Sequence, residues 1–276
     1  MASFPTDLSD AVLLTSSSGR VKAARKLARR NSRAEVRLFL AEGTKALVEA
    51  LELPGCVVEV FATVAATAAE PELRAAVEEA GLPWQPATDD AVASLAGAQA
   101  PQGVVAVCRY VDRPVEVVLT GRTVVICADV RDPGNAGTII RTADAAGVGA
   151  VVLAGSSVDP YNDKTVRATV GSLFHVPIAT GIDVLEAIAT AQAAGYRVLA
   201  ADGSGETDLF AAGDLLAGPV AWLFGNEAWG LPAEIAAAAD HRVSIPIYGR
   251  AESLNLATAA AVCLYASAQA RGTVGE

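Results

Sequence analysis

The chain has 276 residues, 52% of them hydrophobic and 19% charged, so its composition predicts one large or two medium globular domains and excludes a disordered protein. No apolar run reaches the ~20 residues that a membrane helix needs, and Met1 to Asp7 contain no basic-then-apolar signal sequence, so we expect a cytoplasmic protein. The net charge of −10 argues at first against a nucleic-acid partner.

The distribution of the charge reverses that argument. Residues 20–37 hold eight basic residues and one acid, a net charge of +7, which leaves −17 for the rest of the chain. A concentrated basic stretch on an acidic protein is typical of phosphate binding, whereas the alternative is an ordinary solvated helix face. We predict RNA or DNA contacts here, with the candidates Arg20, Lys22, Arg25, Lys26, Arg29 and Arg30.

In chain order, the first half predicts a small α/β unit. Helices are expected through Leu47 and Leu51, over 71–80 and over 89–95, and strands over 57–62 and 104–108. Turn signals in 109–121 indicate a linker. The second half predicts strands over 124–128, 150–153, 197–201, 220–224 and 242–245, alternating with helices over 136–146, 164–174, 183–193 and 253–269. This alternation favours a parallel sheet with helices on both faces.

Cysteine and histidine usage excludes several kinds of site. The four cysteines stand in apolar stretches and form no C-x-x-C pair, so we expect buried free thiols. His175 and His241 are the two histidines, which disfavours a histidine metal centre or a Ser-His-Asp triad. We expect no metal. The chain also lacks the G-x-G-x-x-G fingerprint of a dinucleotide-binding dehydrogenase and the Lys-Ser/Thr of a P-loop.

Three polar, glycine-containing segments each follow a predicted strand, where open α/β sheets build ligand sites. In the first, Asn135 stands where a helix N-cap is expected, and Arg141 follows in an apolar helix as either a salt-bridge partner or an anion ligand. The second, Gly225-Asn226-Glu227, allows a ligand to approach the backbone, and Glu227 could accept hydrogen bonds from a ligand or orient Arg141. The third ends in Ser253-Leu254-Asn255, with Ser253 as the expected N-cap of the last helix.

Together, the three segments resemble the SpoU (TrmH-type) branch of the SPOUT RNA methyltransferases. The matching patterns are N-x-G-x-x-x-R from Asn135, F-G-N-E from Phe224, and Ile245-Pro246 followed by Ser253-Leu254-Asn255. The first half resembles the RNA substrate-binding domain of many members, through residues 39–43 and 101–103.

The resemblance implies an RNA substrate-binding domain at 1–112, a linker at 113–121, and an α/β SPOUT domain at 122–276 with a deep C-terminal trefoil knot. It implies a homodimer that uses S-adenosylmethionine to methylate a ribose 2′-hydroxyl of RNA. The implied catalytic residues are Asn135, Arg141, Glu227, Ser253 and Asn255, and Lys164 and Arg167 join the RNA-binding candidates. The implied cofactor-binding residues are Ala201, Gly203, Gly225, Asn226, Ile245 and Leu254.

The RNA target stays open at this point. The extra N-terminal domain favours large-subunit ribosomal RNA over tRNA, for either a housekeeping or an antibiotic-resistance enzyme. An RNA-binding protein without catalytic activity is the alternative from another class, and the intact motif residues argue against it. Because a guanidinium stays protonated in proteins, we expect Arg141 to grip a phosphate and stabilise developing charge, not to act as a base.

Overall fold

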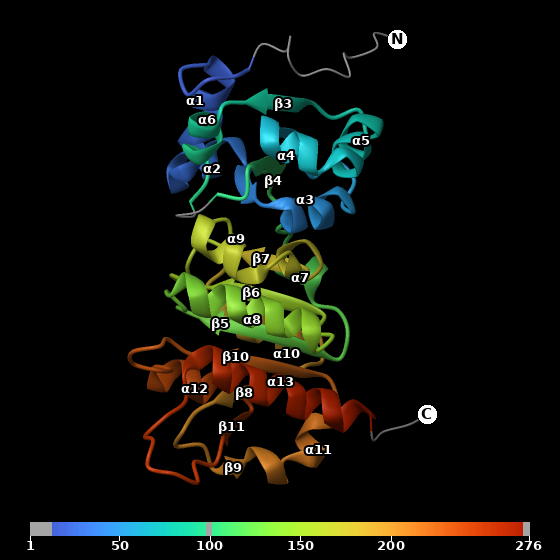
Figure 1. The fold of residues 1–276 in the computed structure, drawn as a ribbon. Coiled ribbons are helices and arrows are strands. Elements are labelled where there is room, and N and C mark those ends of the chain that lie inside the picture. Colours follow the sequence, from blue (N-terminus) through green and yellow to red (C-terminus); the bar gives the residue numbers. More distant parts are fainter. Residues whose placement is uncertain (1–12, 98–100, 273–276) are drawn as a thin grey trace. The chain divides into compact units, whose positions relative to one another are not determined.

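The computed structural model describes residues 13–97 and 101–272, so the N-terminal segment Met1 to Asp7 lies outside the described residues. The chain forms two units (Figure 1). Unit 1 comprises residues 1–110 and 161–171, and unit 2 comprises residues 111–160 and 172–276. Among the described helices, none combines the length and the apolar character needed to cross a membrane.

Unit 1 is built on a four-stranded mixed sheet. Its order is β1-β4-β2-β3, with β1 and β2 antiparallel to β4 and with β3 parallel to β2. The strands are β1 (Leu38–Glu42), β2 (Val57–Thr63), β3 (Trp84–Ala87) and β4 (Val104–Arg109). The helices are α1 (Gly19–Arg25), η2 (Lys26–Ala28), α2 (Arg30–Val36), α3 (Thr44–Leu51), α4 (Val64–Ala69), α5 (Pro71–Glu79), α6 (Asp89–Ala93) and α9 (Asp163–Thr169).

One segment joins unit 1 from far along the chain. Tyr161 stacks on Tyr110 with ring centroids 3.7 Å apart and also contacts the ring of Phe39 at 4.8 Å. The helix expected over 164–174 is therefore two pieces. Helix α9 ends at Thr169, Val170 and Gly171 adopt positive φ angles, and the short helix η3 (Ser172–Phe174) follows in unit 2.

Unit 2 is built on a seven-stranded, fully parallel sheet of order β7-β6-β5-β10-β8-β11-β9, which confirms the predicted parallel α/β architecture. The strands are β5 (Thr123–Ala128), β6 (Ala150–Ala154), β7 (Ile178–Thr180), β8 (Arg197–Ala201), β9 (Thr207–Asp208), β10 (Val220–Phe224) and β11 (His241–Ser244). The remaining helices are α7 (Val115–Val118), α8 (Pro133–Ala145), α10 (Val184–Ala193), η4 (Leu209–Ala211), α11 (Gly213–Leu216), α12 (Ala233–Ala238) and α13 (Leu256–Gly272).

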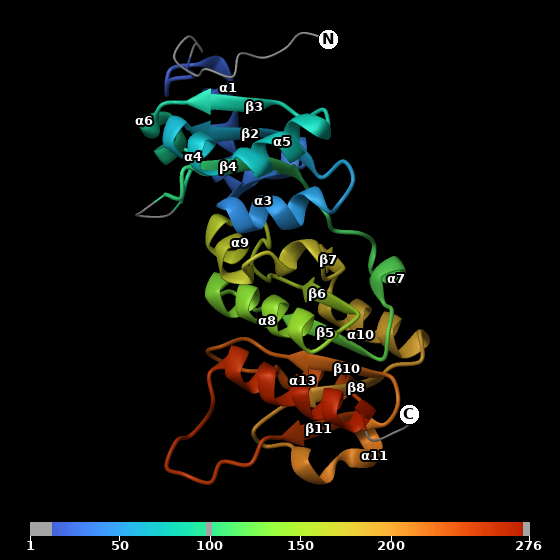
Figure 2. The ribbon, with the colours of Figure 1, turned by 45° about the vertical axis from the view of Figure 1, so that its right-hand side comes forward.

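Helices cover both faces of this sheet. Helices α7 and α10, with part of α12, pack on one face over Ile126, Val152 and Leu223. Helices α8 and α13 lie side by side on the other face (Figures 1 and 2), where Trp222 donates its indole N–H to Ser267 Oγ at 2.8 Å. Strand residues that face both layers must be apolar, which explains the uninterrupted apolar runs of β5, β6 and β10.

The segment expected as a linker, residues 113–121, contains a structured element. Helix α7 lies within it, and its Val115 and Val118 are buried in the core of unit 2. The amide of Arg113 also donates to the carbonyl of Ile178 at 2.9 Å. Proline and glycine in this stretch predicted a break in regular structure, but the apolar residues between them are anchored by the sheet. The ranges of the three expected segments stay a prediction.

The four cysteines are free and buried, as expected. Burial raises the pKa of Cys127 to about 12 and raises that of Cys263 well above its usual value. The pKa of Cys56 is instead lowered, mainly by a hydrogen bond from the Cys108 thiol. The thiolate is the reactive form, so burial and a raised pKa both suppress labelling.

We therefore expect a disulfide reagent at pH 8 to label Cys127 and Cys263 in the native protein at least about 100-fold more slowly than in guanidinium chloride. Cys56 is the internal comparison and should react first among the four. Mass spectrometry of labelled peptides would give the order, and rapid native labelling of Cys127 would contradict the burial argument.

Candidate active site

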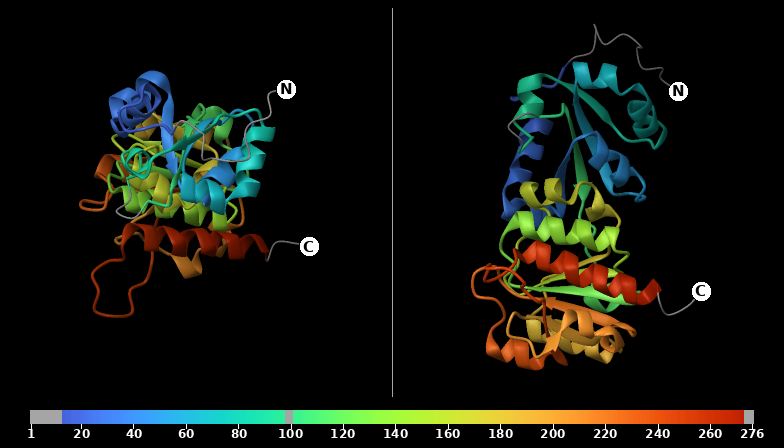
Figure 3. Two further views of the ribbon diagram at one scale, coloured as in Figure 1. Left: turned by 45° about the horizontal axis from the view of Figure 1, so that its top comes forward. Right: turned by 60° about the horizontal axis from the view of Figure 1, so that its bottom comes forward.

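Four loops of unit 2 leave the carboxyl ends of neighbouring parallel strands and meet at one edge of the sheet. They span 129–132 after β5, 225–232 after β10, 202–206 after β8 and 245–255 after β11. The last of these extends from the sheet as a long loop before α13 begins (Figures 2 and 3). The neighbours β5 and β10 mark the point where the strand order changes direction, which is the usual ligand position in open α/β sheets.

A cavity of about 370 Å³ lies among three of these loops. Its walls include all six predicted cofactor-binding residues, Ala201, Gly203, Gly225, Asn226, Ile245 and Leu254, together with the predicted catalytic residues Glu227 and Ser253. Asp202, Ala228, Gly230, Val243, Ile247, Glu252, Leu256 and Ala259 complete the lining. The cavity has the size of an ordinary small-molecule site.

Glu227 ties the loop after β10 to the loop after β5. Its carboxylate accepts hydrogen bonds from the backbone N–H of Arg131 at 3.2 Å and of Asp132 at 3.0 Å, and from Asn135 Nδ2 at 3.3 Å. These hydrogen bonds of Glu227 go to Arg131, Asp132 and Asn135 at the start of α8, and the expectation that Glu227 orients Arg141 stays a prediction. Glu227 thus connects the start of α8 to the cavity wall that it lines.

Asn135 and Asn255 extend this network, but Asn135 and Ser253 do not have the capping roles that were expected of them. Asp132 is the N-cap of α8, with its Oδ1 accepting from the Asn135 amide at 2.7 Å. Asn255 caps α13 through Oδ1, which accepts from Ala257 N at 2.9 Å, while its Nδ2 donates to Asn135 Oδ1 at 3.1 Å. Ser253 precedes α13 and lines the cavity. The side-chain amide of each asparagine thus both donates and accepts a hydrogen bond.

Asp132 could have been found from sequence, because Asp followed by Pro133 matches the preference for an acidic N-cap and for proline at the first helical position.

Arg141 lies two turns further along α8 and is exposed. Within the described ranges, its side chain makes no hydrogen bond or ion pair. The salt-bridge alternative for Arg141 therefore has no support in unit 2, and its guanidinium is available to an external anion.

The predicted RNA-binding residues of the basic segment lie on α1, on η2, at Arg29 between η2 and α2, and at the start of α2 in unit 1. Lys22, Lys26, Arg29 and Arg30 are exposed, and Arg20 is exposed with an ion pair to Glu59 at 3.1 Å. Arg25 is half-buried and donates to the carbonyl of Ser16.

Two other basic residues of unit 1, Arg33 and Arg167, make contacts within the protein. Arg33, 4% exposed, donates to the carbonyls of Leu27 and Ala28 at 2.9 Å and so stabilises the turn between η2 and α2. On α9, Lys164 is exposed, whereas Arg167 pairs with Asp163 at 3.2 Å and with Glu42 at 3.7 Å.

Three residues near the cavity were not expected. Asp129 follows β5 with a left-handed φ of 56°, and its Oδ1 accepts from Ser156 N at 2.6 Å. Arg131 lies with its guanidinium carbon 5.1 Å from the ring centroid of Trp229, which is 53% exposed. Asp129 could have been found from sequence as a polar residue directly after a strand. The contact between Arg131 and Trp229 joins residues 98 positions apart, so it could be found only from the structure.

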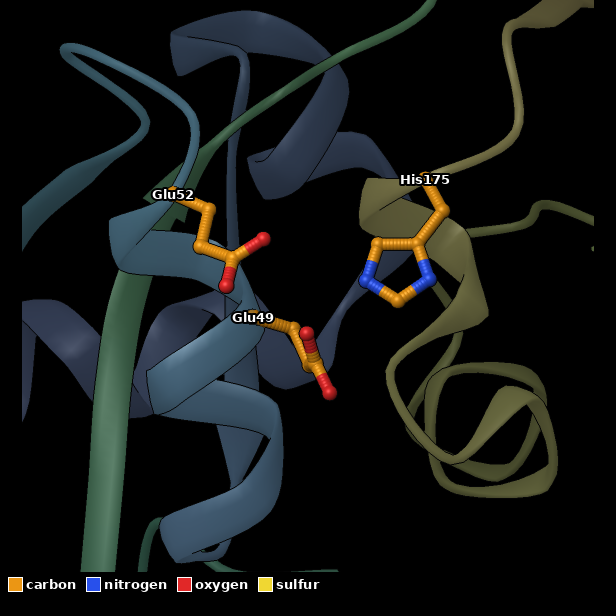
Figure 4. Close-up of side chains that lie close together, drawn as sticks. All are labelled: Glu49, Glu52 and His175. Atoms are coloured by element: carbon orange, nitrogen blue, oxygen red, sulfur yellow. The ribbon is translucent and has the colours of Figure 1, made fainter.

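Figure 4 draws the side chains of Glu49, Glu52 and His175. The two glutamates belong to unit 1, at α3 and directly after it, and His175 belongs to unit 2, where its Nδ1 is 2.9 Å from Asp144 Oδ2. Because these residues belong to different units, we assign no metal site to them.

Comparison with known proteins adds two family matches. The model of the SpoU rRNA Methylase family matches residues 122–265, and that of the MRM3-like substrate binding domain matches residues 19–106. The chain is 34% identical over 259 residues to the 23S rRNA (guanosine(2553)-2'-O)-methyltransferase RlmP of Bacillus subtilis, with 89% of this chain and 94% of that protein covered.

Solved structures of rRNA methyltransferases are also similar to this chain. The AdoMet-bound rRNA methyltransferase from Sinorhizobium meliloti matches with a TM-score of 0.82 and 34% identity, over 96% of this chain and 98% of that one. The SpoU methyltransferase AviRb from Streptomyces viridochromogenes, in complex with AdoMet, matches with a TM-score of 0.81 and 27% identity, over 94% of this chain and 100% of that one.

Proposed function

Because the chain belongs to the SpoU rRNA Methylase family, we propose that it transfers a methyl group from S-adenosylmethionine to the 2′-hydroxyl of a ribose in 23S ribosomal RNA. The observation that carries the proposal is the meeting of the three family segments at one edge of the sheet. The second and third segments line one cavity, and Asn135 of the first segment is hydrogen-bonded to Glu227 and to Asn255. The similarity to the B. subtilis 23S rRNA enzyme over nearly the whole chain supports the choice of ribosomal RNA.

The cavity fits the methyl donor. Gly225 lies against the backbone of Gly230 and Leu231, so the turn after β10 packs closely as one wall, while a Cβ on Gly203 would meet nothing within 4 Å, so a ligand can approach the backbone there. Backbone groups near Ala201, Gly203 and Asn226 offer polar contacts, and Ile245 and Leu254 offer apolar ones; these six residues are the proposed cofactor-binding set. The cofactor supplies an activated methyl group on a sulfonium, so the protein's main task is alignment.

The proposed catalytic residues divide this task. Asn135 and Asn255, fixed by each other and by Glu227, orient the ribose beside the cavity, and Ser253 lines the wall near them. Arg141 grips a phosphate of the RNA with its two parallel N–H groups and stabilises negative charge on the hydroxyl oxygen as its proton leaves. Water accepts that proton, since a guanidinium is a poor base.

The exchange Glu227→Gln tests the positioning network. An amide keeps one acceptor oxygen but brings an NH2 group towards the backbone donors of Arg131 and Asp132. We expect kcat to fall about 10- to 100-fold, because a shift of about 1 Å in a positioned group can cost 100-fold in rate. Stability should change by less than about 1 kcal/mol, since Glu227 is exposed and water can replace the lost bonds.

The control for this exchange is Glu234→Gln on α12, which is also exposed and lies outside the cavity lining. Steady-state kinetics would separate kcat from the KM for S-adenosylmethionine, which should stay constant. An unchanged kcat in Glu227→Gln would contradict the positioning role.

RNA is held over a wider surface in this proposal. The exposed cations Lys22, Lys26, Arg29 and Arg30, with Arg20 and Arg25 beside them, lie in the region that matches the substrate-binding domain. Lys164 and Arg167 add two cations on α9 of the same unit. Phosphate contacts by such residues provide affinity and register without reading sequence.

Three further properties belong to the proposal. The domain ranges 1–112 and 122–276 give the RNA-binding and methyltransferase parts. The C-terminal segment forms a deep trefoil knot, as the family resemblance implies. The protein works as a cytoplasmic homodimer, and exposed apolar side chains such as Tyr265 on α13, 54% exposed, are compatible with a second copy.

Mapping of ribose methylation in the host's RNA, with and without the gene, tests the function directly. The expected result is the loss of one 2′-O-methyl group in 23S rRNA. Loss of a methyl group in tRNA instead would favour the tRNA alternative, and no change in either RNA together with no binding of S-adenosylmethionine would favour a catalytically inactive RNA-binding protein.

A further inference from the structure

Trp229 is an exposed aromatic residue beside the cavity that no packing requirement explains. It is 53% exposed, whereas Trp84 and Trp222 are 8% and 0% exposed and donate their indole N–H groups to Thr67 and Ser267. Its two neighbours in sequence, Ala228 and Gly230, line the cavity. An exposed indole beside a cavity offers an aromatic face on which a planar ligand can stack.

The turn that carries Trp229 is held at both ends. Asn226 and Gly230 exchange backbone hydrogen bonds of 3.0 and 2.9 Å, and Asn226 Oδ1 accepts from Ala228 N at 2.8 Å. Asn226 Nδ2 also donates to the carbonyl of Asp129 at 2.7 Å, which ties the turn to the loop after β5. The indole ring is therefore presented by a preorganised turn, so little conformational entropy is lost when it binds.

Arg131 completes the arrangement. Its guanidinium carbon lies 5.1 Å from the Trp229 ring centroid, within the range of a cation–π contact. Its backbone N–H is bound by Glu227, which also binds Asn135. The indole and the guanidinium are thus linked to the groups proposed to orient the ribose.

We propose that Trp229, with Arg131, forms a stacking platform for a nucleobase of the RNA substrate next to the ribose that is methylated. The inference rests on the proposed function. Splayed bases of structured RNA are bound on aromatic rings and on guanidinium planes, and one stacked base contributes enough to change affinity by about 5- to 150-fold. Trp229 would then favour one conformation of the bound RNA and would take no part in the methyl transfer itself.

Kinetics with an in vitro transcript of the host's 23S rRNA test the platform. Trp229→Ala is expected to raise the KM for RNA about 5- to 150-fold, with kcat at saturating RNA and the KM for S-adenosylmethionine changed less than about twofold. Trp229→Phe should recover most of the loss, because a smaller ring still stacks. The control is Phe210→Ala on η4, whose ring is 61% exposed and lies outside the cavity lining.

Fluorescence gives a second readout that does not need turnover. Because the other two tryptophans are buried, RNA binding should quench the Trp229 component of the emission, and Trp229→Phe should abolish that quenching. A double-mutant cycle of Arg131→Ala and Trp229→Ala should be non-additive if the two side chains act as one platform.

The outcomes separate this inference from the proposed function. If the wild-type protein methylates no ribose of the transcript or of native rRNA, the proposed function fails. If it does methylate and Trp229→Ala leaves the KM for RNA unchanged, the platform fails alone. An equal rise in the KM for S-adenosylmethionine would place Trp229 in the cofactor site, and dissociation of oligomers in light scattering would place it in an interface between copies; either result overturns the platform.

Discussion

Exchange of Arg141 for lysine is expected to lower kcat for ribose methylation about 100- to 1000-fold, the loss typical when a charge-stabilising donor is removed from an active site. Lysine keeps the positive charge but replaces a planar fork of donors by a point charge, so it cannot make two parallel hydrogen bonds to one phosphate. Arg141 is exposed on α8, and both residues favour helices equally, so the fold should be unaffected.

The affinity pattern distinguishes this role from simple charge attraction. RNA affinity in Arg141→Lys should fall less than about tenfold, because only one of many phosphate contacts is weakened, and the affinity for S-adenosylmethionine should stay constant. Arg122→Lys is the matched control, since Arg122 is exposed at the amino end of β5, the edge of the sheet opposite the loops of the site. Near-normal turnover with normal RNA affinity in Arg141→Lys would refute the bidentate grip.

Gly225→Ala is expected to abolish binding of S-adenosylmethionine and to lower the Tm by several degrees. A Cβ at Gly225 would lie 2.5 Å from the Gly230 carbonyl oxygen and 2.7 Å from Leu231 N, and backbone atoms cannot rotate away as a side chain can. Overpacking of this kind costs about 1–3 kcal/mol. The displaced turn forms a wall of the cavity, so the cofactor site is distorted as well.

Gly203→Ala is the matched control for stability. Gly203 lines the same cavity, but a Cβ there has no neighbour within 4 Å, so the Tm should stay within about 2 °C of the wild-type value. Calorimetric binding of S-adenosylmethionine and a thermal scan would be measured on each variant. If Gly225→Ala folds poorly, its Tm still tests the close approach, and an unchanged Tm together with unchanged binding would refute it.

Local patterns predicted most of the regular elements. The strand 197–201 and the strand 220–224 have the expected bounds, and the Pro and Gly that flank α5 marked that helix to within one residue. Short elements such as β3 were not predicted. Pro86 disfavours a strand in general, but it is tolerated in β3 because β3 forms the edge of its sheet. Helix α7 was not predicted because turn residues surround it.

The candidate site was predicted as a set of residues and not as an arrangement. Polar segments after strands identified Gly225, Asn226 and Glu227, because parallel strands bring their carboxyl ends to one edge. Sequence reasoning assigned the wrong caps at Asn135 and Ser253, since more than one polar residue could fill each position. Which one caps depends on where the helix meets its loop.

Composition, periodicity and motif order by themselves determined the parallel α/β class of the second half, the set of polar loop residues and the basic segment, because these depend on local propensity and on which residues can be buried. Tertiary structure alone decided that Glu227 binds the first turn of α8, that Asn255 reaches Asn135 across 120 positions, and that Arg131 lies over Trp229. Such pairings depend on strand order and loop paths, which follow from the summed packing of the whole sheet and leave no trace in the local sequence.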